Sequence, residues 1–289
     1  MCQRVDPLAF FRLKLYVEVS AVKKNKRIGM LVDELTSNPC KLFDSRHFCE
    51  KFVIAKSSLS EDIRVANELL EESGTGHIES ISGVGGGIKF VPGISKEDIA
   101  KLQEEMSEAL ADESRSLGGG YLYTSDIMYN GEFVQKMARV FAMKFYELGA
   151  DCVVTVETKG IPLASQVAML LNIPLVVIRR EAKYSEGSTV SINYFSGSSD
   201  RIQKMSISKR AVVPGSKAII IDDFMRGGGS LKGIQEILDE FEVETVGMGV
   251  ALAEVKPEKK RIDNYTPILY IDINKDDANK TIIKPNEEL

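Results

Sequence analysis

One short stretch of the chain constrains its fold more than any other. Residues 218–221, Ala-Ile-Ile-Ile, have the composition of a buried strand, and two aspartates, Asp222 and Asp223, follow them directly. Glycines at 227–229 and Ser230 then open a segment with helical periodicity. Carboxylates at the end of a buried strand are costly unless each has a binding partner. This strand–loop–helix unit therefore predicts a ligand site.

The residue types in this unit indicate which ligand it would bind. Backbone N–H groups and the dipole at a helix start favour a phosphate. The two aspartates could accept hydrogen bonds from neighbouring sugar hydroxyls, so the unit predicts a sugar-phosphate site. A capped helix with exposed acids is the alternative interpretation. A Walker loop is excluded, because the order Gly-Lys-Ser/Thr is absent.

From residue 121 onward, predicted strands and helices alternate. Continuous apolar strands between amphipathic helices favour an α/β fold with a mostly parallel sheet covered on both faces. Ligands in such sheets bind beyond the carboxyl ends of the strands. The predicted helices cover residues 132–148, 162–171 and 230–241, and the predicted strands cover 152–156, 175–178, 217–221 and 245–252.

A second loop follows a predicted strand at the same edge of this sheet. It contains Thr158, Lys159 and Gly160. Glycine allows backbone amides to face an anion, and the lysine adds positive charge. A simple turn is the alternative, and the loop by itself favours the simple turn.

The first ninety residues have a different pattern. Helices are predicted over 28–38 and 45–52, the latter capped by Asp44. Ser58 and Glu61 form a capping box for a third helix, whose buried stripe is Leu59, Ile63, Ala66 and Leu70. Two short β segments joined by glycines then predict a hairpin over residues 76–91. Three helices and a hairpin predict a winged-helix DNA-binding domain, with a plain α+β scaffold as the alternative.

Net charge does not by itself demand nucleic acid, because it is −5 at pH 7. DNA binding would need a local basic surface. A helix in the major groove reads base edges with its N-terminal half. We expect base contacts from Ser57, Ser58, Ser60 and Arg64, and phosphate contacts from Lys24, Lys26, Arg27, Lys56 and Lys89.

These patterns divide the chain into four parts. Residues 1–23 are expected to be a disordered or family-specific extension, and 24–93 to be the winged helix. Residues 94–120 are expected to be a connecting helix and linker, and 121–289 the effector-binding domain.

Cysteine spacing and hydropathy bear on the compartment. The four cysteines, Cys2, Cys40, Cys49 and Cys152, include no CxxC pair, which makes a structural zinc site improbable and fits a reducing cytosol. No apolar run approaches the length of a membrane span. The sequence therefore predicts a cytoplasmic protein with no membrane association.

Several segments, taken in order, resemble the purine operon repressors of Gram-positive bacteria, and residues 222–230 resemble the motif of type I phosphoribosyltransferases that binds 5-phosphoribosyl-1-pyrophosphate (PRPP). The segments that carry the resemblance are residues 55–63, 83–87, 119–123, 158–161, 186–194 and 222–226.

This resemblance implies a homodimer in which a winged helix precedes a type I phosphoribosyltransferase-like domain. It implies repression of purine synthesis and salvage genes, relieved by PRPP, with the alarmone (p)ppGpp competing for the same pocket and Mg²⁺ accompanying PRPP. It also implies a long, mobile hairpin over the site, within residues 186–199. The implied effector residues are Tyr121, Thr158, Lys159, Gly160, Asp222, Asp223, Phe224, Met225, Arg226, Gly227, Gly228, Gly229 and Ser230.

Two questions stay open on the sequence alone. The leading hypothesis has no catalytic residue and no required cofactor, whereas the alternative is an active purine phosphoribosyltransferase. A purely structural dimer module does not explain residues 222–230. Glu157 lies beside the pyrophosphate loop, where it would either weaken anion binding or help to hold Mg²⁺.

Overall fold

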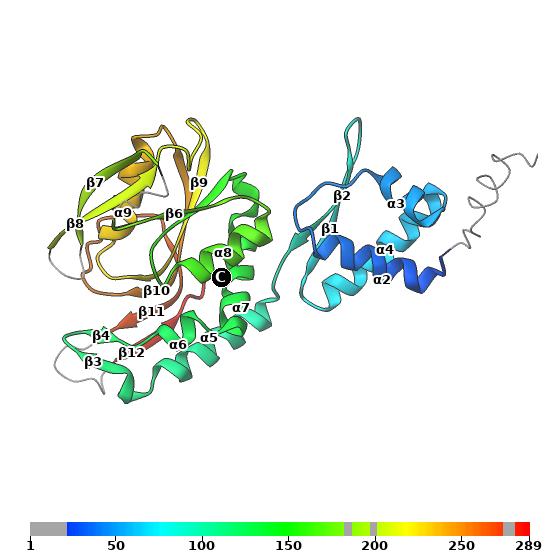
Figure 1. The fold of residues 1–289 in the computed structure, drawn as a ribbon. Helices are drawn as coiled ribbons and strands as arrows, with labels where there is room; N and C mark the ends of the chain where they lie inside the picture. The colour runs from blue at the N-terminus through cyan, green and yellow to red at the C-terminus, as the bar shows by residue number, and fades with distance from the viewer. Residues whose placement is uncertain (1–21, 182–186, 197–200, 274–280) are drawn as a thin grey trace, which may run out of the picture. The chain divides into compact units, whose positions relative to one another are not determined.

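The computed structural model describes residues 22–181, 187–196, 201–273 and 281–289 (Figure 1). The chain forms two compact units, Met1–Glu72 with His77–Phe90, and Ser73–Gly76 with Val91–Leu289. All but the last two residues of the expected extension, 1–23, lie outside the described residues, as do 186 and 197–199 of the expected hairpin.

In the described part of the first unit, three helices and a β-hairpin are present, as predicted. Its core contains the buried faces of all three helices, including Leu35, Phe48 and Leu59. Asp44 caps the second helix by accepting a hydrogen bond from the Arg46 amide at 2.8 Å. The elements are α2 (Lys24–Thr36), α3 (Ser45–Phe52), α4 (Lys56–Glu72), β1 (Gly76–Ile81) and β2 (Gly87–Pro92).

The hairpin is braced by the segment before α3. Phe43 and Ile88 exchange two backbone hydrogen bonds of 2.9 Å. A Cβ atom on Gly87 would lie 2.1 Å from the Phe43 carbonyl oxygen, so only glycine allows this close approach. The contact between the hairpin and the segment before α3 therefore depends on Gly87.

The predicted capping box on the third helix is wrong. Helix α4 begins at Lys56, and the Leu59 amide donates to the Ala55 carbonyl, which places Ser58 inside the first turn. The buried face also differs, because Asp62 is buried and Ile63 is only partly buried. Asp62 can occupy the core because Arg27 pairs with it.

A six-stranded sheet forms the centre of the second unit. Its order is β12-β11-β10-β9-β5-β6, and every neighbouring pair is parallel except β11 with β12. The strands are β5 (Cys152–Val156), β6 (Leu175–Ile178), β9 (Lys217–Met225), β10 (Glu244–Glu254), β11 (Thr266–Asp272) and β12 (Ile282–Pro285). This confirms the α/β class and the mostly parallel sheet.

Both faces of this sheet are covered, because side chains alternate along the central strand. Ile219 and Ile221 face a core shared with α5 (Lys96–Leu110), α7 (Gly131–Phe145) and α8 (Ile161–Leu171). Ala218 and Ile220 face a second core on the side of α9 (Gly229–Asp239).

Residues 94–120 were expected to connect two domains, but all of them belong to the second unit. Ile99, Leu102 and Met106 of α5 are buried in its core. The amide of Gln103 donates to the carbonyls of Ile268 and Asn286 at 3.1 and 2.9 Å. Helical periodicity showed an amphipathic helix there, but it could not show which surface that helix would cover.

Small elements connect α5 to α7. They are the single turn η1 (Glu113–Arg115), the strands β3 (Ser116–Gly118) and β4 (Tyr121–Leu122), and the short helix α6 (Ser125–Met128). Another single turn, η2 (Tyr146–Leu148), ends α7. The strands β3 and β4 pair antiparallel through a turn of three glycines, 118–120, all with positive φ.

The hairpin after β6 extends further than predicted. It comprises β7 (Thr189–Ser196) and β8 (Arg201–Ser208), and these strands pack on α9. Tyr194 and Met205 are buried there, and a Cβ atom on Gly233 of α9 would lie 2.9 Å from Tyr194. The described part of this hairpin therefore forms a layer that packs on α9.

Candidate functional site

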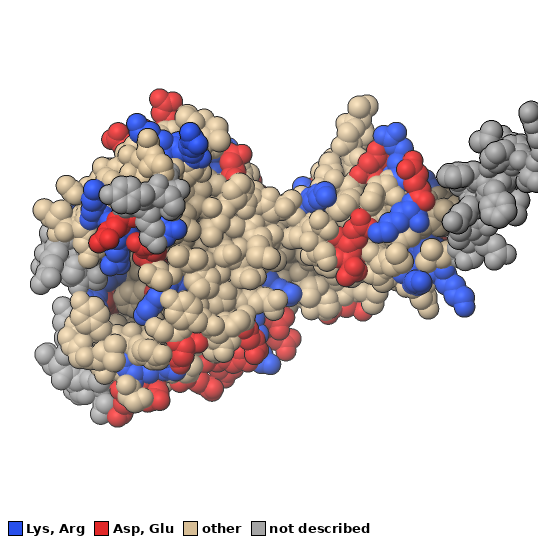
Figure 2. Space-filling view, viewed as in Figure 1, with Lys and Arg blue, Asp and Glu red and all other residues tan. Residues whose placement is uncertain are grey.

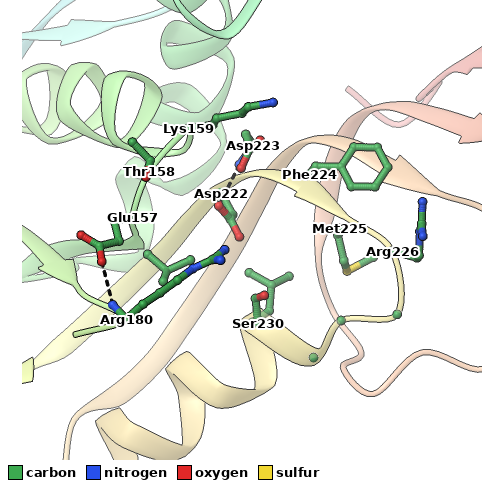
Figure 3. A pocket seen from close by; sticks show the side chains of 15 residues that line it. Glu157, Thr158, Lys159, Arg180, Asp222, Asp223, Phe224, Met225, Arg226 and Ser230 are labelled. Carbon is green, nitrogen blue, oxygen red and sulfur yellow. Dashed lines mark hydrogen bonds between the residues drawn. The ribbon is translucent and has the colours of Figure 1, made fainter. Parts of the chain in front are cut away.

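A cavity of about 420 Å³ lies at the carboxyl ends of β5 and β9, where the alternating pattern predicted a site (Figure 3). Figure 2 shows basic and acidic side chains close together around a hollow in the second unit. The cavity is within the size range of small-molecule sites. Its lining is Val156, Glu157, Thr158, Lys159, Arg180, Asp222, Asp223, Phe224, Met225, Arg226, Gly227, Gly228, Gly229, Ser230 and Leu231.

The two aspartates lie within strand β9 rather than after it. Asp222 is 4% exposed, and its carboxylate accepts a hydrogen bond from the Asp223 amide at 3.0 Å. Burial, followed by the charge of Asp223, raises the pKa of Asp222 well above its ordinary value. Burial also raises the pKa of Asp223. Two adjacent carboxyls in this state gain from a ligand that donates hydrogen bonds or brings a cation.

The loop from β5 to α8 is pressed against this pair. A Cβ atom on Gly160 would lie 2.6 Å from Thr155 Oγ1 and 2.8 Å from Asp222 Oδ1, so a side chain there would displace the loop. Thr158 and Lys159 thereby line the cavity, and the positive charge of Lys159 acts on Asp223. The structure therefore brings the two predicted loops together.

The start of α9 forms the opposite wall. Gly228 adopts a left-handed conformation with φ of 78°, and none of the described side chains caps the helix. The amides of its first turn therefore have no intrahelical acceptor. Gly229 and Ser230 line the cavity there, as an anion site requires.

Arg226 and Tyr121 are near the cavity, but their side chains engage each other. The guanidinium lies over the Tyr121 ring, 5.3 Å from its centroid, and Nε donates to Glu254 Oε2 at 2.5 Å. The same guanidinium donates to the Gly120 carbonyl. Lys260 donates to the carbonyls of Arg226 and Glu254, and burial lowers the pKa of its ammonium.

Sequence reasoning missed Arg180, which lines the cavity from the end of β6. Its charge favours the ionised form of Asp222. A basic residue two positions after a predicted strand of the same sheet was the available signal. The Arg180 amide donates to Glu157 Oε1 at 2.8 Å (Figure 3). The Arg179 guanidinium donates to Glu157 Oε2 at 3.4 Å. The Glu157 carboxylate thus accepts hydrogen bonds from two groups, the Arg179 guanidinium and the Arg180 amide.

The candidate base-reading residues lie on α4 of the first unit. Ser57, Ser60 and Arg64 are exposed and Ser58 is partly exposed. The Ser60 hydroxyl donates to the Lys56 carbonyl, and Arg64 forms an exposed ion pair with Glu68 at 2.6 Å. Such surface pairs contribute little, so DNA can replace them.

The candidate phosphate contacts fall into two groups. Lys24 and Lys89 form surface pairs with Glu61 and Glu79, and Lys26 and Lys56 are exposed. Figure 2 shows such basic and acidic side chains together on the visible face of this unit.

Arg27 differs from these lysines, because it pairs with buried Asp62 at 2.7 and 3.1 Å. The guanidinium is 12% exposed and Asp62 is 1% exposed. Arg27 is better described as a link between α2 and α4 than as a phosphate contact.

The structure was also searched for metal sites and membrane spans. Within the described ranges, no three His, Cys, Asp or Glu side chains are grouped so that they could hold a metal ion. In that same part of the chain, no helix is both long and apolar enough to cross a membrane.

Two family models match the chain. Residues 23–92 match the N-terminal domain of the bacterial purine repressor, and residues 124–285 match the phosphoribosyl transferase domain.

Three known proteins are similar over most of the chain. A probable purine biosynthesis transcriptional regulator of Streptococcus pneumoniae is 40% identical, over 86% of this chain and 91% of its own length. A purine biosynthesis transcriptional repressor of Bacillus subtilis is 40% identical, over 85% of this chain and 87% of its own length. A purine biosynthesis transcriptional activator of Lactococcus lactis is 36% identical, over 90% of this chain and 96% of its own length.

Solved structures match the second unit. The adenine phosphoribosyltransferase of Rhodothermus marinus gives a TM-score of 0.51 at 18% identity, over 59% of this chain and 99% of that chain. The adenine phosphoribosyltransferase of Saccharomyces cerevisiae gives a TM-score of 0.50 at 20% identity, over 58% of this chain and 97% of that chain. At this identity the likeness shows the fold alone.

Proposed function

The chain belongs to the family of bacterial purine repressors and is a DNA-binding transcriptional regulator of purine biosynthesis, and on this premise we propose that it is a repressor induced by PRPP. In this proposal the winged helix binds operator DNA as part of a homodimer in the cytoplasm. The phosphoribosyltransferase-like domain binds the effector and catalyses nothing.

One observation carries the effector proposal. Asp222 is buried and Asp223 is partly buried, both have raised pKa values, and both line the same cavity as the uncapped start of α9. A phosphorylated ribose supplies both missing partners, because its hydroxyls donate to the carboxylates and its phosphate accepts from the helix amides.

The remaining charge of the cavity suits a pyrophosphate. Lys159 and Arg180 line it, and the charge of Glu157 is engaged by Arg179 and the Arg180 amide. Mg²⁺ would be held mainly by pyrophosphate oxygens and water, because it binds enzymes through few protein ligands when phosphates are present. The alarmone (p)ppGpp carries comparable phosphate groups and would compete for the same anion site.

The relatives that match most of the chain favour effector binding over catalysis, because they are transcriptional regulators. An enzyme of this class must also shield its reacting sugar from water. An active purine phosphoribosyltransferase remains the alternative that the experiment below tests.

The test is a gel shift with a purine-operon promoter fragment, with and without Mg-PRPP. Salt must be held constant, because the affinity of a protein for DNA depends steeply on it. We expect tight operator binding that Mg-PRPP reverses and that (p)ppGpp restores. Absence of operator binding, together with consumption of PRPP when purine bases are added, would instead establish an enzyme.

A further inference from the structure

Glu254, at the end of β10, is a buried acid for which the proposed function gives no role. Its side chain is 3% exposed, and its carboxylate accepts a hydrogen bond from Arg226 Nε at 2.5 Å. A buried carboxylate in this position requires a cationic partner. Arg226 is that partner, although it belongs to the loop of residues 222–230, which we call the effector loop.

The guanidinium of Arg226 lies to one side of the cavity. It is 13% exposed, and it donates to the Gly120 carbonyl as well as to Glu254. Figure 3 shows this side chain beyond Met225, on the far side of that residue from Asp222 and Arg180. The positive charge is therefore held away from the part of the cavity where the other charged side chains meet.

Lys260 holds the backbones of both ion-pair partners, Arg226 and Glu254. Lys260 Nζ donates to the Arg226 carbonyl at 2.6 Å and to the Glu254 carbonyl at 2.5 Å. These hydrogen bonds hold the backbone of the effector loop beside β10. Arg226 already lines the cavity, so only its side chain need change position to contact a bound effector.

We propose that Glu254 sets the effector affinity by competing with the anionic effector for the Arg226 guanidinium. This inference rests on the proposed function. An effector gains a charge-assisted hydrogen bond from Arg226 only when the guanidinium leaves Glu254.

The same exchange affects the turn between β3 and β4. When the effector takes Arg226, the hydrogen bond from Arg226 to Gly120 is lost. Gly118, Gly119 and Gly120 have φ values of 79°, 61° and 78°, which glycine adopts without strain. Effector binding therefore releases this turn from the effector loop.

The deciding variant is Glu254→Gln, which keeps the size of the side chain and removes its charge. We expect it to bind Mg-PRPP roughly tenfold more tightly in titration calorimetry, as the loss of one charge-assisted competitor implies. The Mg-PRPP concentration that releases half of the operator should fall by the same factor. Glu258→Gln is the matched control, because exposed Glu258 loses the same charge.

A double-mutant cycle with Arg226→Gln identifies the partner. In that background Glu254→Gln should change the Mg-PRPP affinity less than about twofold, within the error of additivity. If Glu254→Gln does not fold, Glu254→Asp withdraws the carboxylate by one methylene and should shift the affinity in the same direction.

The outcomes separate this inference from the proposed function. Wild-type protein that fails to bind Mg-PRPP overturns the proposed function. Wild-type protein that binds, with a folded Glu254→Gln variant that binds equally or more weakly, overturns the competition, because Glu254 would then orient Arg226 for the ligand. An equal gain in Glu258→Gln overturns it as well, because a general charge effect would explain the result.

Discussion

At the scale of single residues, Asp222 lowers the stability of the folded state, and in the proposed function it binds the ligand. Burial and the charge of Asp223 raise its pKa, so the folded protein binds a proton there more tightly than the unfolded chain. The folded state therefore loses stability as the pH rises from the ordinary aspartate pKa, about 3.9, through the raised value. The loss is complete above the raised pKa.

Asp222→Asn removes this cost and also replaces the charged acceptor proposed for the ligand with a neutral amide. We expect the free energy of unfolding at neutral pH to rise by roughly 1 kcal/mol, and the gain to disappear below about pH 4. Effector binding should weaken at least about tenfold, because a charged hydrogen bond is lost. Denaturation at two pH values and calorimetry measure both effects, and an unchanged effector affinity would contradict the role given to Asp222.

Arg64 gives the complementary prediction in the first unit. Its ion pair with Glu68 is exposed at both ends, so Arg64→Ala should change stability by less than about 0.5 kcal/mol. We expect operator affinity to fall by about tenfold or more, because one base contact typically contributes 1–3 kcal/mol, roughly. Gel shift and calorimetry check this, with Mg-PRPP binding retained as the control. Loss of both activities would show that the two sites are not separate.

At the scale of elements, two helical glycines in different environments show how packing decides the effect of a substitution. Alanine favours a helix over glycine by about 1 kcal/mol. On Gly29 of α2, among the described residues, no atom outside its own helix and neighbours lies within 4 Å of an added Cβ. On Gly233 of α9, the added atom would lie 2.9 Å from Tyr194 and 3.2 Å from Met205 Sδ.

The two substitutions should therefore have opposite signs. Gly29→Ala should stabilise the first unit by up to about 1 kcal/mol. Gly233→Ala should destabilise the second unit, because overpacking costs roughly 1–3 kcal/mol and exceeds the helical gain. Thermal melting followed by circular dichroism distinguishes them. A stabilised Gly233→Ala variant would show that the hairpin of β7 and β8 can move away from α9.

At the scale of the whole molecule, the proposed regulation is a coupling between two sites on different units. If Mg-PRPP lowers operator affinity by a given factor, saturating operator DNA must lower Mg-PRPP affinity by the same factor. Calorimetric titration of Mg-PRPP into free protein and into the protein–operator complex measures this factor independently of gel shifts. Unequal factors would show that Mg-PRPP acts on the DNA or at a second site.

Much of this molecule could be predicted from local sequence, because the deciding interactions are local. The winged-helix pattern, the sheet strands 152–156 and 175–178, and the effector loop all follow from periodicity, capping residues and glycine placement. The loops carrying Gly160 and Asp222 could be paired in advance because parallel strands end at one edge of a sheet.

Only the tertiary structure decided which side chains face each other across the fold. Arg27 donates hydrogen bonds to Asp62, although the two are distant in sequence. Arg226 donates hydrogen bonds to Glu254 and to the Gly120 carbonyl. Helix α5 became part of a core because β11 and β12 provide a face for it. Sequence periodicity indicates that a face will be buried, but long-range packing chooses its partner.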